Sequence, residues 1–397
     1  MREMKDSGVE WLGEVPAEWD VVPGKRILML LQRPVEDGDG VVTCFRDGEV
    51  TLRANRRTEG FTIALKEIGY QGVEPGDLVV HGMDGFAGSI GISDSRGKAS
   101  PVLNVMDSDQ NKRFLMYYMR GLAYRDVYMA LSDGIRVRSC NLSWKKIGNL
   151  PFALPPLPVQ RRIADYLDEK CAEIDRAVSA AERSIEELNL YRSARLEEVI
   201  TRVSHEAPRE KLKYVLKESK DKSPDGIGEP LSITIARGVL RSAELSIPNP
   251  TSSLVGAKIV HAGDLVFNKL KAYYGVMYVS PYNGLISPEY AVYRAIDMGR
   301  TSLKYLEYVF HTAAMIDEFI IRISGVADGF RRLYTSDLFD IAVPVPSIEV
   351  QQGIVAELDD LYASIFESTE AKQAIIADLK AYKQSLIYEV VTGKREV

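Results

Sequence analysis

Four segments of the sequence combine basic, aromatic and amide side chains beside turn residues. RDGEVTLRANRR (46–57) and DGIRVRSCN (133–141) lie in the first half of the chain, and FNKLKAYYG (267–275) and GVADGFRRLY (325–334) lie in the second half. Arginine and asparagine can read guanine and adenine edges, while lysine and tyrosine hold phosphates. The alternative is a set of solvated basic loops. The candidate nucleic-acid-binding residues are Arg53, Arg56, Arg57, Arg136, Arg138, Asn141, Asn268, Lys269, Lys271, Tyr273, Arg331, Arg332 and Tyr334.

No segment has the residue pattern of a catalytic site. The glycines of HGMDGFAGSIG (81–91) recur at every third position but do not form a G-x-G-x-x-G fingerprint, and a G-x-x-x-x-G-K-[ST] loop is absent. IPNPTS (247–252) lacks the second proline and the aromatic residue of the amino-methyltransferase signature. The histidines have no Asp, Cys or Ser at nucleophile spacing; they are His81, His205, His261 and His311. We therefore expect a non-catalytic chain that holds no cofactor and no metal.

The composition is that of a globular protein with more than one domain. The chain has 397 residues, of which 46% are hydrophobic. No apolar run approaches the length of about 18 residues that crosses a bilayer, and the charged N-terminal segment lacks the apolar core of a signal peptide. We expect no membrane contact and a cytoplasmic location. The cysteines are far apart in the sequence, which predicts neither a disulfide framework nor a zinc site.

The net charge of −6 is distributed unevenly along the chain. Residues 20–154 and 205–345 are weakly basic, whereas residues 1–19, 155–204 and 346–397 are acidic. This partition suits basic modules joined by acidic helices, and it permits nucleic-acid binding without requiring it.

An internal duplication organises the sequence. Residues 75–105 align without a gap with residues 262–292, and residues 155–201 align without a gap with residues 346–392. The matched positions include glycines, which mark equivalent turns, and the apolar residues of the second segment. A repeat of this length indicates a duplicated domain with its following helix and not a solenoid.

Each copy predicts a mixed domain followed by a long helix. Short apolar and aromatic runs between glycine-rich turns predict strands, and residues 111–131 and 302–323 have helical spacing. FNKLKAYYG is expected to continue the strand that follows Gly263. Prolines at 155, 156 and 158, and at 344 and 346, end the two domains because proline lacks an amide donor.

The helix that follows each proline stop is roughly 45 residues long and spans about 65 Å. In the first copy, apolar residues at alternating steps of four and three form a coiled-coil seam. A narrow seam needs a partner helix, and the other copy is the obvious candidate. The residues expected to form the partner-binding helices are Leu167, Ile174, Ile185, Leu188, Leu358, Ile365, Ile376 and Leu379.

Together these motifs resemble the specificity subunit of a type I restriction-modification system, over essentially the whole chain. The resemblance is carried by LPPLPVQRRIADYLDEKCAEID (154–175) and its looser copy VPVPSIEVQQGIVAELDDLYASI (343–365), by MKDSGVEWLGEVPAEW (4–19) and by residues 263–294. It implies an α+β fold in which two mixed α/β target-recognition domains are separated by two long antiparallel coiled-coil helices. It also implies an internal duplication with circular pseudo-two-fold symmetry.

The resemblance implies five parts. They are an N-terminal segment near the distal helix (1–19), a first target-recognition domain (20–154), a central helix (155–204), a second target-recognition domain (205–345) and a C-terminal helix (346–397). The partners implied are double-stranded DNA, two modification subunits that bind S-adenosylmethionine, and restriction subunits.

Two differences between the copies refine this expectation. The first copy has HGMD (81–84) where the second has NKLK (268–271), which predicts an asymmetric DNA target. The N-terminal segment has no full counterpart after the first helix, so VVTGKREV (390–397) is expected to meet the N-terminus. Two other classes stay open: a coiled-coil scaffold that binds only protein, and a single-chain methyltransferase.

Overall fold

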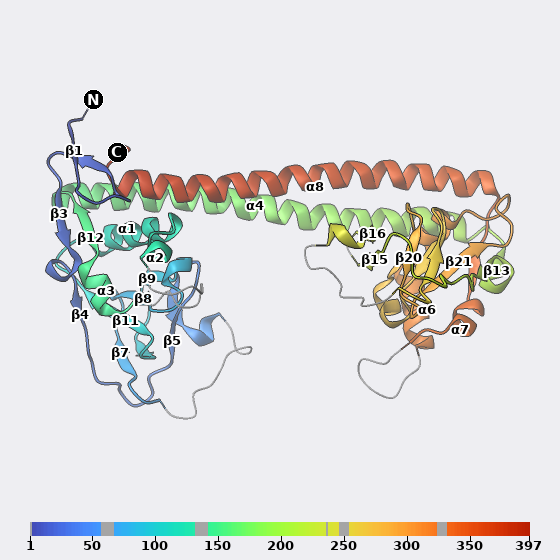
Figure 1. The fold of residues 1–397 in the computed structure, drawn as a ribbon, viewed down its shortest axis with the longest axis horizontal. Helices are drawn as coiled ribbons and strands as arrows, with labels where there is room; N and C mark the ends of the chain where they lie inside the picture. Colours follow the sequence, from blue (N-terminus) through green and yellow to red (C-terminus); the bar gives the residue numbers. More distant parts are fainter. Residues whose placement is uncertain (1, 57–66, 132–141, 236, 246–253, 324–331) are drawn as a thin grey trace. The chain divides into compact units, whose positions relative to one another are not determined.

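A computed structural model of the chain describes residues 2–56, 67–131, 142–235, 237–245, 254–323 and 332–397. It consists of two compact units, the first formed by Met1–Glu182 with Gln373–Val397 and the second by Arg183–Lys372. Two long helices contribute to both units, α4 (Leu157–Ser204) and α8 (Ile348–Val391) (Figure 1). The expected α+β fold with two long helices is confirmed.

The described residues of unit 1 form short strands, three short α-helices and three 3-10 turns. Its strands are β1 (Met4–Asp6), β2 (Glu14–Pro16), β3 (Asp20–Pro23), β4 (Met29–Leu30), β5 (Val42–Cys44), β6 (Val50–Leu52), β7 (Gln71–Val73), β8 (Leu78–His81), β9 (Ile90–Ile92), β10 (Gly97–Ala99), β11 (Leu103–Asp107) and β12 (Pro151–Leu154). The helical elements are η1 (Gly24–Arg26), η2 (Arg53–Asn55), η3 (Gly85–Ala87), α1 (Lys112–Tyr124), α2 (Val127–Ala130) and α3 (Trp144–Asn149).

Unit 2 repeats this order of elements from β3 onward. Its strands are β13 (Arg209–Lys211), β14 (Leu216–Glu218), β15 (Leu231–Thr234), β16 (Gly238–Arg241), β17 (Lys258–Val260), β18 (Leu265–Phe267), β19 (Met277–Val279), β20 (Gly284–Ile286), β21 (Ala291–Ala295) and β22 (Ala342–Pro344). The helical elements are η5 (Leu212–Tyr214), η6 (Ser242–Glu244), η7 (Lys269–Tyr274), α5 (Leu303–Phe310), α6 (Ala313–Arg322) and α7 (Thr335–Phe339).

Apart from the β1-β2 pair of unit 1, the strand pairing is the same in both units. An antiparallel sheet of order β4-β11-β8-β9 in unit 1 corresponds to β14-β21-β18-β19 in unit 2. The smaller pairs also correspond, since β12-β3, β10-β7 and β5-β6 match β13-β22, β17-β20 and β15-β16. The sequence duplication is therefore a duplication of topology.

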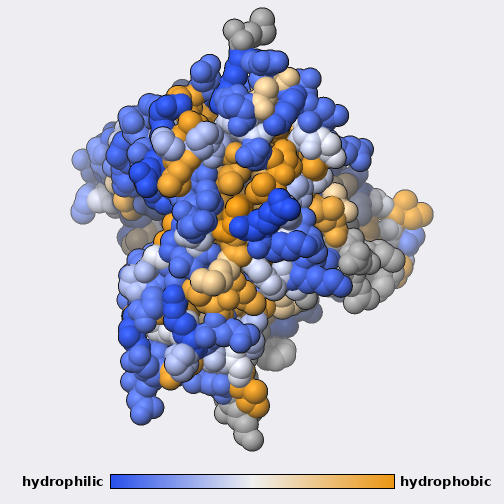
Figure 2. All heavy atoms as spheres, turned by 90° about the vertical axis from the view of Figure 1, so that its left-hand side faces the viewer, coloured by the Kyte–Doolittle hydropathy of each residue, from blue (hydrophilic) through white to orange (hydrophobic). Residues whose placement is uncertain are grey.

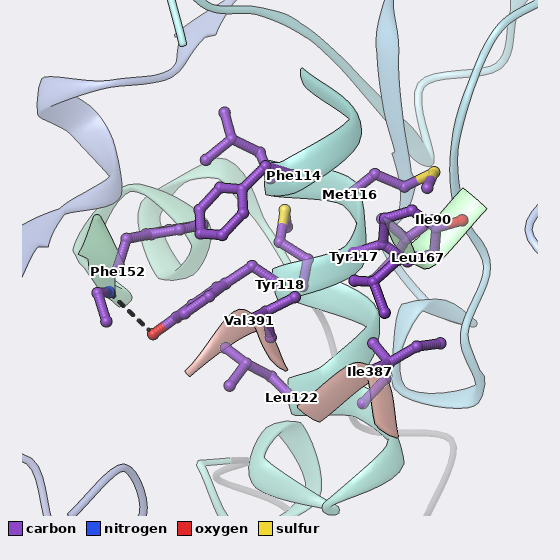
Figure 3. Packing of buried hydrophobic residues seen from close by; sticks show 14 of the residues in the cluster. Ile90, Phe114, Met116, Tyr117, Tyr118, Leu122, Phe152, Leu167, Ile387 and Val391 are labelled. Carbon is purple, nitrogen blue, oxygen red and sulfur yellow. Dashed lines mark hydrogen bonds between the residues drawn. The ribbon is translucent and has the colours of Figure 1, made fainter. Parts of the chain in front are cut away.

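In each unit, the strands and the short helices form a module. This module packs against the beginning of one long helix and the end of the other. In unit 1 the core contains aromatic residues of α1 together with Leu167 of α4 and Ile387 and Val391 of α8 (Figure 3). The corresponding core of unit 2 contains Leu358 of α8 and Val199 of α4. Burial of large apolar side chains is the main stabilising contribution in both units.

A buried glutamine joins the module of unit 1 to α4. Gln160 has no exposed surface. Its amide nitrogen donates to the carbonyl oxygen of Pro155 at 2.8 Å, and its amide oxygen accepts from the backbone N–H of Asn111 at 3.0 Å. Asn111 caps the N-terminus of α1, so the glutamine connects the proline stop to the main helix of the module.

Gln351 repeats this joint in unit 2. It is also fully buried, and it donates to the carbonyl oxygens of Pro346 at 2.8 Å and Arg300 at 2.9 Å. Its amide oxygen accepts from the backbone N–H of Ser302, the N-cap of α5, at 2.9 Å. The paired glutamines of the sequence alignment are therefore equivalent structural joints.

The two long helices are antiparallel within each unit. In unit 1, Asp175 and Glu182 of α4 pair with Lys383 and Lys380 of α8, at 2.7 and 3.3 Å. In unit 2, Glu357 of α8 pairs with two arginines of α4, Arg195 at 2.9 Å and Arg202 at 2.8 Å.

The C-terminal end of α8 meets the N-terminal segment inside unit 1, as the sequence predicts. The hydroxyl of Tyr388 donates to the carbonyl oxygen of Trp11 at 3.0 Å. Gly393 lies against Pro16 and Trp19, close enough that an added Cβ would be 3.1 Å from the Trp19 ring. Hydrophilic residues cover most of the face seen in Figure 2, with groups of hydrophobic residues between them.

The two helical segments predicted in the modules are each interrupted. Residues 111–131 form α1 and α2, because Asp126 adopts a left-handed conformation with φ of 56°. Residues 302–323 form α5 and α6, because Thr312 is extended, with ψ of 149°.

Candidate nucleic-acid interface

A 3-10 turn holds the first group of candidate residues in unit 2. The prediction that these residues continue a strand is wrong, because β18 ends at Phe267 and η7 follows it. The Asn268 side chain starts the turn by accepting a hydrogen bond from the backbone N–H of Leu270 at 3.1 Å. Asn268 is 5% exposed and acts as a cap. Lys271 and Tyr273 are exposed, as is their neighbour Tyr274, so these side chains of η7 are open to a ligand.

The segment that begins at Arg332 lies beside this turn. The backbone N–H of Leu333 donates to the carbonyl oxygen of Lys269 at 3.1 Å. Arg332 pairs with Glu289 at 2.9 Å, and Tyr334 is 49% exposed at the N-cap of α7. The structure therefore brings two of the candidate segments together on unit 2.

An ionic network that sequence reasoning missed lies next to Lys269. The Glu218 carboxylate accepts from Lys258 at 2.9 Å and from the Thr335 hydroxyl at 2.7 Å, and the Lys269 ammonium lies 3.6 Å away. Burial opposes ionisation of Glu218, but the hydrogen bonds from Lys258 and Thr335 outweigh it and lower its pKa. No local sequence motif indicates this network, because its members come from four separate elements, β14, β17, η7 and α7.

Unit 1 has the equivalent turn with different side chains. The imidazole Nδ1 of His81 takes the place of the Asn268 amide and accepts from the backbone N–H groups of Met83 at 3.2 Å and Asp84 at 3.0 Å. The backbone N–H of Leu142 donates to the carbonyl oxygen of Gly82 at 2.7 Å, which repeats the contact beside η7. Burial lowers the pKa of His81, which favours the neutral ring that can accept these bonds.

Two further candidate arginines of unit 1 belong to the segment around β6. Arg53, in η2, donates to the Thr43 hydroxyl at 3.3 Å. Arg56 pairs with Asp47 at 2.7 Å and Glu49 at 3.0 Å, and its guanidinium stacks 4.3 Å from the ring centre of Phe45. These contacts hold both side chains against the module.

Five candidate residues lie outside the described part of the chain. They are Arg57, Arg136, Arg138, Asn141 and Arg331.

Neither a metal centre nor a membrane span is found in the described part of the chain. No group of three or more His, Cys, Asp or Glu side chains there could hold a metal ion. No helix there is long and apolar enough to cross a membrane.

Comparison with known proteins gives no sequence match but a clear structural one. No family model and no curated protein matches the chain. A chain from a structure of the type I R-M system, reported for complex assembly and conformational transition, is 16% identical with a TM-score of 0.71, over 96% of this chain and 99% of that one. The HsdS subunit from Thermoanaerobacter tengcongensis is 17% identical with a TM-score of 0.54, over 96% of this chain and 98% of that one. The chain has the HsdS fold.

In this HsdS fold, the residues predicted to form the partner-binding helices lie inside the chain. Leu167 and Leu358 have no exposed surface, and Ile174 and Ile365 are also buried. The other four are partly buried: Ile185, Leu188, Ile376 and Leu379. Leu167, Ile174, Ile376 and Leu379 belong to the apolar core of unit 1, and Leu358 belongs to the apolar core of unit 2.

Proposed function

We propose that the chain is the DNA sequence-recognition subunit of a type I restriction-modification complex. The observation that carries this proposal is the duplicated module within an HsdS fold, with an equivalent turn in each copy. Two copies of one DNA-binding module fit a bipartite DNA target, because each module can read one half-site. The fold positions the two turns, and their side chains supply the recognition chemistry.

The two turns support an asymmetric target. Asp84 of unit 1 stands where unit 2 has Lys271, and Gly82 stands where unit 2 has Lys269. The Asp84 carboxylate accepts hydrogen bonds, whereas the ammonium groups of Lys269 and Lys271 donate them. The two modules therefore favour different base edges and different phosphate contacts. The two half-sites therefore differ in sequence.

The long helices are proposed to dock two modification subunits, which bind S-adenosylmethionine and methylate adenine, and restriction subunits join this complex. Large apolar side chains on the helix surfaces support a docking role, since Leu190 is 71% exposed and Phe366 is 64% exposed. In this proposal the chain contributes recognition, while the modification subunits supply the cofactor and the catalytic residues.

A first experiment measures DNA binding by the chain in complex with its modification subunits. Lys269→Ala should weaken binding to all sequences and reduce the slope of log affinity against log salt by about one, because one phosphate contact is lost. Arg331→Ala is expected to weaken DNA binding as well. Lys217→Ala, an exposed lysine on β14 outside these loops, is the matched control and should bind as the wild type does. Unchanged affinity at low and high salt for both loop variants would remove these loops from the site, and a wild-type complex that binds no DNA would favour a protein scaffold.

A second experiment tests whether the helices set the gap between half-sites. Removing one heptad (about seven residues) within 169–188 of α4, with a matching heptad of α8, shortens the pair by about 10 Å, or about three base pairs. The methylated motif should keep both half-sites and lose about three base pairs of the gap. A motif with an unaltered gap would contradict this role.

A further inference from the structure

An exposed ion pair of unit 1 is not explained by folding. Arg46, on the turn between β5 and β6, pairs with Asp84 at 3.0 Å, next to η3. The side chain of Arg46 is 70% exposed and that of Asp84 is 36% exposed. Exposed ion pairs of this kind add little stability. The pair is therefore available for another role at the turn that corresponds to η7.

Two glycines allow the turn that carries Arg46 to lie beside Asp84. The β5–β6 turn packs closely against β9, where a Cβ at Gly91 would overlap the carbonyl oxygen of Gly48. At Gly88 a Cβ would lie 3.2 Å from the carbonyl oxygen of Arg46, and the φ of +94° also favours glycine. The glycines of HGMDGFAGSIG thus permit a close approach that brings Arg46 beside Asp84.

Arg46 is held differently from the other arginines of its segment. Arg56 is 35% exposed and pairs with two carboxylates of its own hairpin, while Arg53 lies against Thr43. Arg46 reaches across to a different turn, and Asp84 is fixed there by its own backbone N–H, which donates to His81. A guanidinium whose N–H donors are oriented by a fixed carboxylate is preorganised for directional hydrogen bonding.

We propose that Arg46 is a specificity-determining residue of the first module, which reads a guanine of one half-site while Asp84 positions its guanidinium. The inference rests on the proposed function. Arginine donates to O6 and N7 of guanine in the major groove, and a neighbouring carboxylate can accept from N4 of cytosine. The pair carries little net charge, so it contributes less to phosphate binding than an isolated cation does. The chemistry points to a G·C base pair.

The test uses the complex of the chain with its modification subunits and duplexes that carry its methylated target. Each G·C pair of the target is replaced in turn by A·T, and each guanine by 7-deazaguanine, which removes the N7 acceptor. We expect the wild type to lose about tenfold or more in affinity at one guanine read by Arg46. For Arg46→Ala this discrimination should disappear at that position alone, with the other half-site and the salt slope unchanged.

Two further variants separate recognition from stability. Asp84→Asn keeps Arg46 but loosens it, so discrimination at the same guanine should weaken without disappearing. Arg96→Ala removes another exposed arginine of unit 1 that pairs with carboxylates, including Glu74 at 3.3 Å, and should leave discrimination intact. The inference is overturned if Arg46→Ala keeps wild-type discrimination at every position. It is also overturned if that variant loses affinity uniformly with a smaller salt slope, as a phosphate contact would.

Failure of this inference differs from failure of the proposed function. A wild-type complex with a bipartite target whose discrimination survives Arg46→Ala refutes only the role of Arg46. A wild-type complex that shows no bipartite target refutes the function itself.

Discussion

The buried glutamine joint of unit 2 gives a prediction whose magnitude follows from its contacts. Gln351→Met keeps the length of the side chain but removes its three hydrogen bonds to backbone groups. Each such bond contributes about 1 kcal/mol net, so the variant should destabilise the module of unit 2 by about 3 kcal/mol. The expected loss is local, because the equivalent joint of unit 1 depends on Gln160.

Hydrogen exchange of the full-length chain measures this loss directly. Backbone amides of α5 that exchange through opening of the module should exchange about 100-fold faster in Gln351→Met, whereas those of α1 should keep their rates. Gln352→Met is the matched control, because Gln352 is the exposed neighbour on the same helix. Equal effects of the two substitutions, or equal acceleration in α1 and α5, would refute the reasoning that Gln351 joins module and helix.

Three other predictions concern unit 1 and the long helices. Burial lowers the pKa of His81 below its ordinary value of 6.5. As the pH drops below about 6.5, His81 is protonated in the unfolded chain before it is protonated in the native state, so the free energy of unfolding should fall. His81→Asn keeps an acceptor at the position of Asn268 and should reduce this loss in urea unfolding between about pH 7.5 and 5. Gly91→Ala should destabilise unit 1 by about 1–3 kcal/mol in the same assay, because its Cβ overlaps a backbone carbonyl. Gly353→Ala, in α8, meets no atom within 4 Å and should instead stabilise the chain by about 1 kcal/mol.

The architecture could be predicted because its signals are local or repeated. Prolines at the ends of the modules and the long apolar seam after them predict a domain followed by a helix, and matched glycines predict matched turns. The interruption at Thr312 was not predictable from apolar spacing, because α5 and α6 both continue the same period. The end of β18 was also missed, since the cap formed by Asn268 depends on a side-chain conformation that periodicity does not report.

The arrangement of the candidate site could be predicted only in part. The sequence identified the segments 267–275 and 325–334, but it could not show that Leu333 bonds to Lys269, because the two residues are far apart in the chain. The pairing of Arg46 with Asp84 depends on how closely one turn approaches another. Long-range packing of this kind leaves no pattern within a single segment.

The central claim is that this chain directs a modification complex to a bipartite, asymmetric DNA target. The most direct measurement is a map of adenine methylation in cells that express the chain together with its modification subunits. We expect one motif with two different half-sites and a gap of fixed length, present only when this chain is present. Methylation that does not depend on the chain, or a motif with two identical half-sites, would contradict it.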